Sequence, residues 1–143
     1  MDNEPALTPA IIFSDSAIRD PVTGKLTLAG IFQHIHAHRF PFTSPPFVVT
    51  VFVTNIGGEI ESLPVTMTIE DSGGRIISTA TGHISAISQL ESLYVPEIAF
   101  PLPPTMFKVA GPYQAVVLVD GRRLGYRVLK VTEPLQSRFL PGW

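Results

Sequence analysis

Apolar and polar residues alternate with a period of two over much of the chain. The clearest example begins at Phe47, where Phe47, Val49, Val51 and Val53 form one wholly apolar face. Side chains two residues apart project from the same face of a strand, so this alternation predicts a strand with one face in the core. No stretch of comparable length shows a clear helical period, and the pattern as a whole indicates a β protein.

Turn residues divide the alternating segments from one another. Glycine, proline and aspartate gather in Asp20-Pro21-Val22-Thr23-Gly24, Asp71-Ser72-Gly73-Gly74 and Asp120-Gly121, which are typical hairpin sequences. Residues 85–95 fit either a short helix or strand and irregular structure, and we expect the second. The predicted strands cover residues 10–18, 25–39, 47–54, 63–70, 75–84, 97–100, 113–119 and 124–131.

The predicted strand at 25–39 changes its apolar face midway. Leu26 and Leu28 share a parity with Phe32, whereas the apolar residues near its end, such as Ile35, have the opposite parity. Because the side-chain period is two, this change requires a bulge or a bend. We expect the bend at Gly30, since glycine tolerates the necessary backbone conformation.

These elements predict an all-β, single-domain β-sandwich of seven or eight antiparallel strands, with immunoglobulin-like topology. A chain of 143 residues is close to the usual size of one domain. We expect an N-terminal lead-in at 1–9, the sandwich at 10–132 and a C-terminal tail at 133–143.

Charge and composition restrict the classes of function. Only 15% of the residues are charged and the net charge is −2, so we expect no nucleic-acid partner. The absence of cysteine excludes disulfides and thiolate chemistry. The sequence has neither a signal peptide nor an apolar run long enough to span a membrane, and we therefore expect a cytoplasmic protein without a membrane partner.

Several short motifs resemble a known family of uncharacterised bacterial proteins, classified only as a domain of unknown function. The resemblance implies a small β-sandwich over about residues 8–132 and assigns no functional residue. It is carried by Thr23-Gly24-Lys25-Leu26, Leu28-Ala29-Gly30-Ile31-Phe32, Phe40-Pro41, Phe47-Val48-Val49, Gly111-Pro112-Tyr113, Val119-Asp120-Gly121 and Leu124-Gly125.

Three histidines alternate along one predicted strand. His34, His36 and His38 share one face, and neighbouring members lie about 7 Å apart along the strand. His34 and His36 can reach one zinc or other divalent ion, and His38 or His83 could add a ligand. The alternative interpretation is a plain solvent-facing stripe, which we favour because the opposite face is apolar.

Two predicted strands are apolar on both faces. Phe52 interrupts the outer face of its strand, and Val116 and Leu118 do the same on theirs. A two-layer sandwich needs only one apolar face for each sheet, so the outer faces require a cover. The cover could be a second subunit, another protein or the C-terminal tail, which carries Phe139, Leu140 and Trp143.

The sequence therefore favours a binding or assembly module that acts through a sheet face or edge. Its partner would be another protein or a second copy, and no cofactor is required. No catalytic motif is evident, and Gly-x-Ser-x-Gly is absent. The alternative is a metal-binding protein or metal-dependent enzyme that uses His34, His36 and His38. A ligand carrier with an internal cavity is a third, weaker hypothesis.

Overall fold

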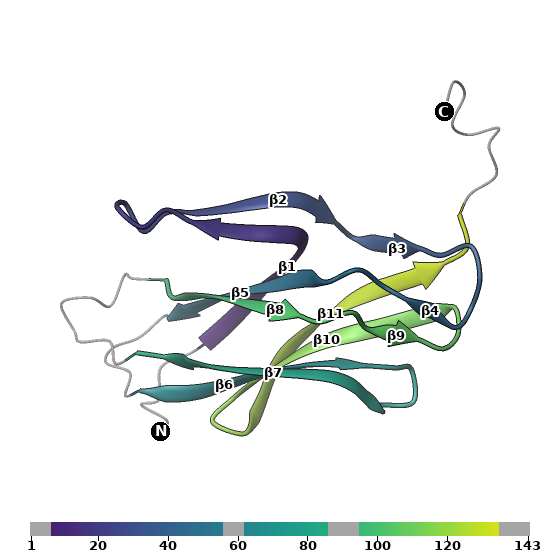
Figure 1. Cartoon of the computed structure of the whole chain (residues 1–143). Helices are drawn as coiled ribbons and strands as arrows, with labels where there is room; N and C mark the ends of the chain where they lie inside the picture. Colours follow the sequence, from purple (N-terminus) through teal and green to yellow (C-terminus); the bar gives the residue numbers. More distant parts are fainter. Residues whose placement is uncertain (1–6, 56–61, 86–94, 135–143) are drawn as a thin grey trace.

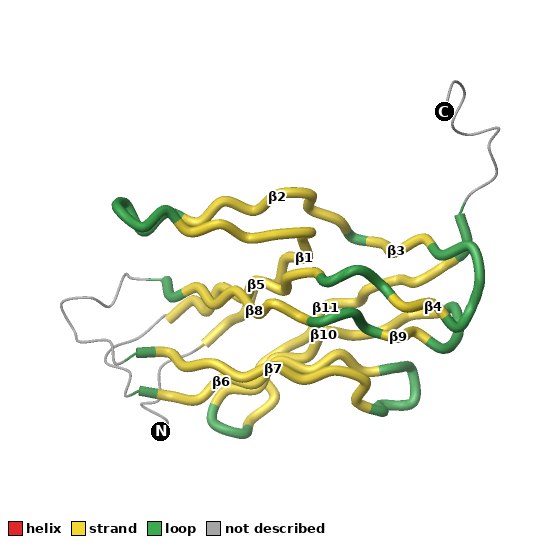
Figure 2. Tube along the Cα trace, in the orientation of Figure 1, coloured by secondary structure: helices red, strands yellow, loops and turns green. Residues whose placement is uncertain are grey.

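A computed structural model describes residues 7–55, 62–85 and 95–134 of the chain. These residues contain no helix, and hence none that could cross a membrane; they form eleven strands joined by turns and loops (Figure 2). The eight longer strands are β1 (Leu7–Arg19), β2 (Leu26–Phe32), β5 (Phe47–Asn55), β6 (Leu63–Glu70), β7 (Ile76–Ile84), β8 (Glu97–Leu102), β10 (Gly111–Val119) and β11 (Arg122–Thr132). The three short ones are β3 (His34–His36), β4 (Phe42–Thr43) and β9 (Met106–Phe107).

Two sheets stack face to face (Figure 1). Sheet A has the order β2-β1-β5-β8, and sheet B has the order β3-β11-β10-β6-β7. Without β2 and the short strands, the first, second and fifth strands lie in sheet A, and the third, fourth, sixth and seventh lie in sheet B. This arrangement is immunoglobulin-like, with the fourth strand beside the third as in variable-type domains. The predicted fold class is confirmed.

Strand pairing differs from the prediction in one respect. Among the described strands, β3 pairs with β11 in parallel, and every other pairing is antiparallel. The parallel pair is possible because β3 and β11 are not joined by a tight hairpin: the seven described strands from β4 to β10 lie between them in the chain.

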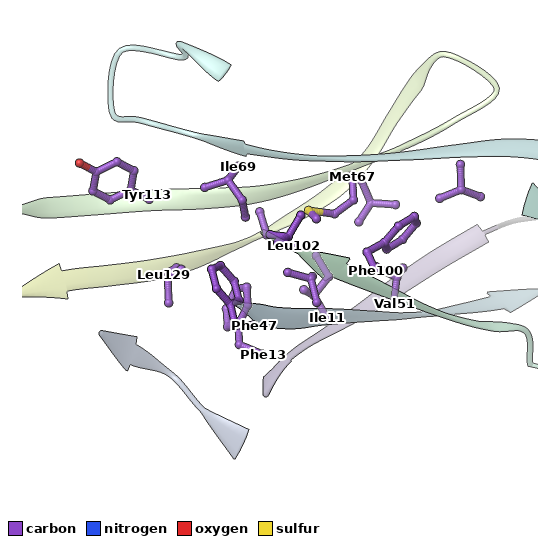
Figure 3. Packing of buried hydrophobic residues seen from close by; sticks show 14 of the residues in the cluster. Ile11, Phe13, Phe47, Val51, Met67, Ile69, Phe100, Leu102, Tyr113 and Leu129 are labelled. Atoms are coloured by element: carbon purple, nitrogen blue, oxygen red, sulfur yellow. The ribbon is translucent and has the colours of Figure 1, made fainter. Parts of the chain in front are cut away.

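The core lies between the two sheets (Figure 3). The apolar face predicted from Phe47 onward points into it, and Val49, Val51 and Val53 are completely buried. β10 supplies the opposite layer with alternating residues from Tyr113 to Val119. Burial of such side chains stabilises the fold by roughly 1.5–3 kcal/mol each relative to exposure.

Tyr113 fastens the loop that precedes β10. Its hydroxyl donates a hydrogen bond to the carbonyl of Val109, at 2.7 Å, and its ring packs edge-on against Phe107 with centroids 4.8 Å apart. Gly111 adopts a φ of 149° between the two bonded residues. A tyrosine at the start of the sixth strand, bonded a few residues upstream, is the tyrosine corner of immunoglobulin-like domains.

β1 changes its pairing partner midway along its length. Its first half pairs with β5 through Leu7–Ser14, and its second half pairs with β2 through Phe13–Arg19. The second half and β2 form a two-stranded arm that doubles back above sheet A (Figure 1). An ion pair of 2.8 Å between Arg19 and Glu97 joins the arm to the first residue of β8.

The predicted turn at 20–24 closes this arm. The Asp20 Oδ1 atom accepts hydrogen bonds from the backbone N–H groups of Val22, at 2.7 Å, and Thr23, at 3.1 Å. These bonds favour the carboxylate and hold the pKa of Asp20 below its usual value. Gly24 completes the turn with a φ of 73°.

The segment predicted as one strand, 25–39, is two strands in different sheets. Phe32 still pairs with Phe13 in sheet A, whereas His34 already pairs with Lys130 in sheet B. The change of apolar parity is therefore a crossing between sheets at Gln33. Gly30 has the irregular backbone expected of it, with a φ of 70°, but the crossing follows three residues later.

Candidate interaction face

The residues predicted to form an interaction surface do not lie together. Phe52 is half-buried on the outer face of sheet A, where it pairs with Ala10 and Glu97. Val116 and Leu118 lie on the outer face of sheet B. Phe139, Leu140 and Trp143 lie outside the described residues.

The outer face of sheet A is largely covered by the chain itself. Ser14 and Thr50 are completely buried on this face, and Val48 is almost so. The β1–β2 arm lies above sheet A (Figure 1). Leu26 and Leu28 on β2 are half-buried. The sequence interpretation did not consider the arm as a cover, because its position depends on a bend in β1 that local pattern does not reveal.

The outer face of sheet B is defined by the residues that alternate with the core positions. On its two central strands, β10 and β6, these are Gln114, Val116 and Leu118 with Thr66, Thr68 and Glu70. β11 adds Tyr126, Val128 and Lys130, and β7 adds Thr79, Thr81 and His83. The face is therefore rich in threonine, with its apolar residues on β10 and β11.

An exposed apolar pair lies on β11, toward one edge of this face, because β3 pairs only with residues 130–132 of that strand. Tyr126 is directly opposite Val116 in the register and is 56% exposed, and Val128 is 41% exposed. Val116 is itself only 2% exposed, because its neighbours enclose it. Val116 thus supports the surface, whereas Tyr126 and Val128 are the groups that another molecule could touch.

Polar side chains hold the surface around Tyr126 in a defined arrangement. The Arg123 guanidinium lies 5.3 Å from the centre of the Tyr126 ring, a cation–π contact. Arg123 also donates a hydrogen bond to Gln114 Oε1 at 3.3 Å. On β6, which lies beyond β10, the Thr68 hydroxyl donates to Glu70 Oε2 at 2.8 Å. The face therefore presents fixed donors and acceptors beside an aromatic ring.

Sequence reasoning missed Tyr126 and Val128, although a signal was present. In the predicted strand 124–131, both residues have the parity opposite to Leu129 and Val131, which are completely buried. That strand is thus apolar on both faces, as the β10 segment is. Applying the argument used for Val116 to this strand would have found them.

The histidines divide between the two edges of sheet B. His34 and His36 are exposed on β3, with nearly parallel rings whose centroids lie 6.1 Å apart. His38 follows them, also exposed, and His83 lies on β7 at the opposite edge of the sheet. Within the described part of the chain, no group of three or more histidine and carboxylate side chains could hold a metal ion. His83 is therefore too remote to assist His34 and His36.

A cavity of about 480 Å³ opens beside the β3 histidines. Asp15 and Gly30 line it from the arm, His34 and His36 from β3, and the chain near Pro45 from the far side. One carboxylate and two imidazoles that the sequence analysis did not connect thus line the same cavity, without being close enough to form a three-ligand group.

Together these features define an immunoglobulin-like β-sandwich with one face covered by its own arm and one face exposed. A sequence model described as "Family of unknown function (DUF6941)" matches residues 9–132, and the chain belongs to this family. The predicted resemblance to an uncharacterised family is confirmed. No curated protein matches the chain in sequence.

Two solved structures show low similarity to the chain. The CARDB domain of a Pyrococcus furiosus protein, in complex with di-metal ions, has a TM-score of 0.47 and 15% identity, over 89% of this chain and 88% of that one. The alkylpurine DNA glycosylase AlkC of Pseudomonas fluorescens, bound to DNA containing an abasic site analog, has a TM-score of 0.43 and 12% identity. That match covers 89% of this chain and 30% of the glycosylase.

Proposed function

We propose that this protein is a non-catalytic binding module that recognises a protein partner through the outer face of sheet B. The observation that carries the proposal is the 56% exposure of Tyr126 beside the exposed Val128, on a face that the β1–β2 arm leaves open. Tyrosine and arginine are enriched among the residues that dominate binding energy in protein interfaces.

The arrangement of side chains supports a preorganised surface. Arg123 is held by both the Tyr126 ring and Gln114, so a partner that contacts it has less side-chain freedom to remove. Tyrosine itself offers a large contact area with few rotatable bonds. The backbone beneath belongs to β11, which pairs along this stretch with the central strand β10.

The composition of the face favours a separate protein over a permanent second copy. Obligate dimer interfaces resemble a domain core, whereas non-obligate interfaces are about as polar as the remaining surface. Here the two exposed apolar residues on β11 are flanked along their own strand by the charged side chains of Arg123 and Lys130, and the rest of the face is polar at Thr79 and Thr81 on β7. This combination of a few apolar and several polar residues is typical of an interface that forms reversibly.

The test is a tagged pull-down with the full-length chain from a lysate of the source organism, read by mass spectrometry. Tyr126→Ser combined with Val128→Thr should abolish capture of a stoichiometric partner, because both substitutions remove exposed apolar contact area. The matched control is Ile18→Thr with Val22→Thr, which changes two residues that are 60% and 91% exposed on the arm.

The control variant should retain the partner, and thermal unfolding should verify that both variants fold. Retention of the same partner by the Tyr126 variant would contradict the proposal, as would loss in the arm variant alone. The pull-down could instead recover only the chain itself, with dimers in sedimentation analysis. That result would contradict a separate partner and show that a second copy of the chain binds the face.

A further inference from the structure

β3 holds two histidines in a fixed relation to each other. Between them Ile35 packs against the core, and after them Ala37 is 1% exposed and donates its N–H to the carbonyl of Thr132 at 2.9 Å. The parallel register places His34 beside Lys130 and His36 beside Thr132. With both alternate residues anchored inward, the two imidazoles must share the outer face.

The separation of the two rings suits a common ligand. Two imidazoles that bind one tetrahedral ion through nitrogens about 2 Å from it have ring centroids roughly 5 Å apart. The centroids of His34 and His36 are 6.1 Å apart, with 23° between the ring planes. The rings are stacked, so each must turn about its side-chain torsions to direct a ring nitrogen at a shared ion, and because both side chains are exposed this requires no movement of the strand.

We propose that His34 and His36 together chelate one divalent transition-metal ion of the class that prefers imidazole, namely Cu²⁺, Ni²⁺ or Zn²⁺. Water completes the coordination, because the described residues provide no third ligand in range. The site is an open, exchangeable one rather than a closed structural site. It does not rest on the proposed protein-binding function.

Two charged groups near the histidines set the expected strength. Lys130 is directly opposite His34 and repels a cation, although its exposed side chain can swing away. Asp15 lines the same cavity as both histidines, and its carboxylate attracts a cation. These opposing effects, and the small number of protein ligands, predict modest affinity that follows the order Cu²⁺ above Ni²⁺ and Zn²⁺.

The test is a calorimetric titration of the full-length, untagged chain with NiCl₂ and ZnCl₂ near neutral pH. We expect one ion for each chain. The second imidazole binds at high effective concentration, so losing either one should weaken binding by about 100-fold. His34→Ala and His36→Ala should each show this loss, whereas the matched controls His38→Ala and His83→Ala should bind as the unchanged chain does.

All four changes are at exposed positions, so the variants should fold, and circular dichroism would verify it. Binding by the His34→Ala or the His36→Ala variant as tight as that of the unchanged chain would overturn the proposal. A comparable loss in His38→Ala would do so as well, and a stoichiometry of one ion for two chains would exclude a chelate within one chain.

Discussion

Two buried threonine hydroxyls differ in whether they have a hydrogen-bond partner. Thr50 is completely buried under the β1–β2 arm, and its Oγ1 atom has no hydrogen-bond partner in the described structure. Thr68 is also buried, but its hydroxyl donates to Glu70 at 2.8 Å. A buried hydroxyl without a partner lowers stability, whereas a bonded one contributes to it.

Replacing Thr50 with valine should therefore stabilise the protein. Thr50→Val keeps the branched shape and removes the unpaired hydroxyl, and we expect the free energy of unfolding to rise by about 1 kcal/mol. Urea unfolding followed by fluorescence or circular dichroism would measure it. The matched control, Thr68→Val, should lower the same quantity by about 1 kcal/mol. A loss of stability in Thr50→Val would show that this hydroxyl is satisfied.

The β1–β2 arm is the element that most distinguishes this sandwich. It bends away from sheet A where Asp15 approaches Gly30, after which β1 pairs only with β2. A Cβ atom on Gly30 would lie 2.2 Å from the Asp15 Oδ2 atom, and Gly30 has a φ of 70°. The backbone conformation thus favours glycine at the bend, and a larger residue would also force the exposed Asp15 side chain to move.

We expect Gly30→Ala to destabilise the chain by roughly 2–3 kcal/mol, since a left-handed conformation and a steric overlap add together. Gly24→Ala is the matched control, because Gly24 has a φ of 73° but no atom within 4 Å of its added Cβ. Its cost should be roughly 1 kcal/mol.

Chemical denaturation of both variants would separate the two contributions. Adding Asp15→Ala to the Gly30→Ala chain should recover part of the difference, because it removes the overlapping carboxylate. Equal losses in Gly24→Ala and Gly30→Ala would argue against a close approach at the bend.

Across the whole molecule, Arg127 links the two sheets. It lies half-buried on β11, donates a hydrogen bond to the carbonyl of Ile11 on β1, and sits 5.7 Å from the centre of the Phe13 ring. Nearby, the Cβ of an alanine at Gly125 would approach Pro9 to 2.8 Å. The first and last long strands therefore meet closely, and Arg127 bonds one to the other.

Arg127→Met should destabilise the fold by about 2 kcal/mol, because the Ile11 carbonyl loses a charged donor and the ring loses its cation. Arg123→Met is the matched control, since Arg123 also lies over an aromatic ring but on the exposed face. It should change the unfolding free energy by less than about 0.5 kcal/mol. Comparable effects in the two variants would contradict a special role for the link between sheets.

Much of the fold could be predicted from the sequence because its signals are local. Alternation identified the buried face of β5, and the turn residues at 20–24 and 71–74 marked real hairpin turns. The crossing at Gln33 was visible only as a change of parity. The predictions for residues 85–95 and for the tail at 133–143 fall mostly outside the described residues.

The candidate sites could be predicted from the sequence only in part. Val116 was correctly placed on an outer face, but the pattern could not show that its neighbours enclose it and leave Tyr126 exposed. The pairing of His34 with His36 followed from spacing, whereas the remoteness of His83 follows from the strand order of sheet B.

The order of apolar residues and turns along this chain is enough to specify a β-sandwich, because side-chain period and turn chemistry act over a few neighbouring residues. The choice of strand partners is different. The tertiary structure determines these partners: β3 pairs with β11, the arm covers sheet A, and the outer face of sheet B stays exposed. These outcomes depend on contacts between residues as distant as Arg19 and Glu97, which no local pattern contains.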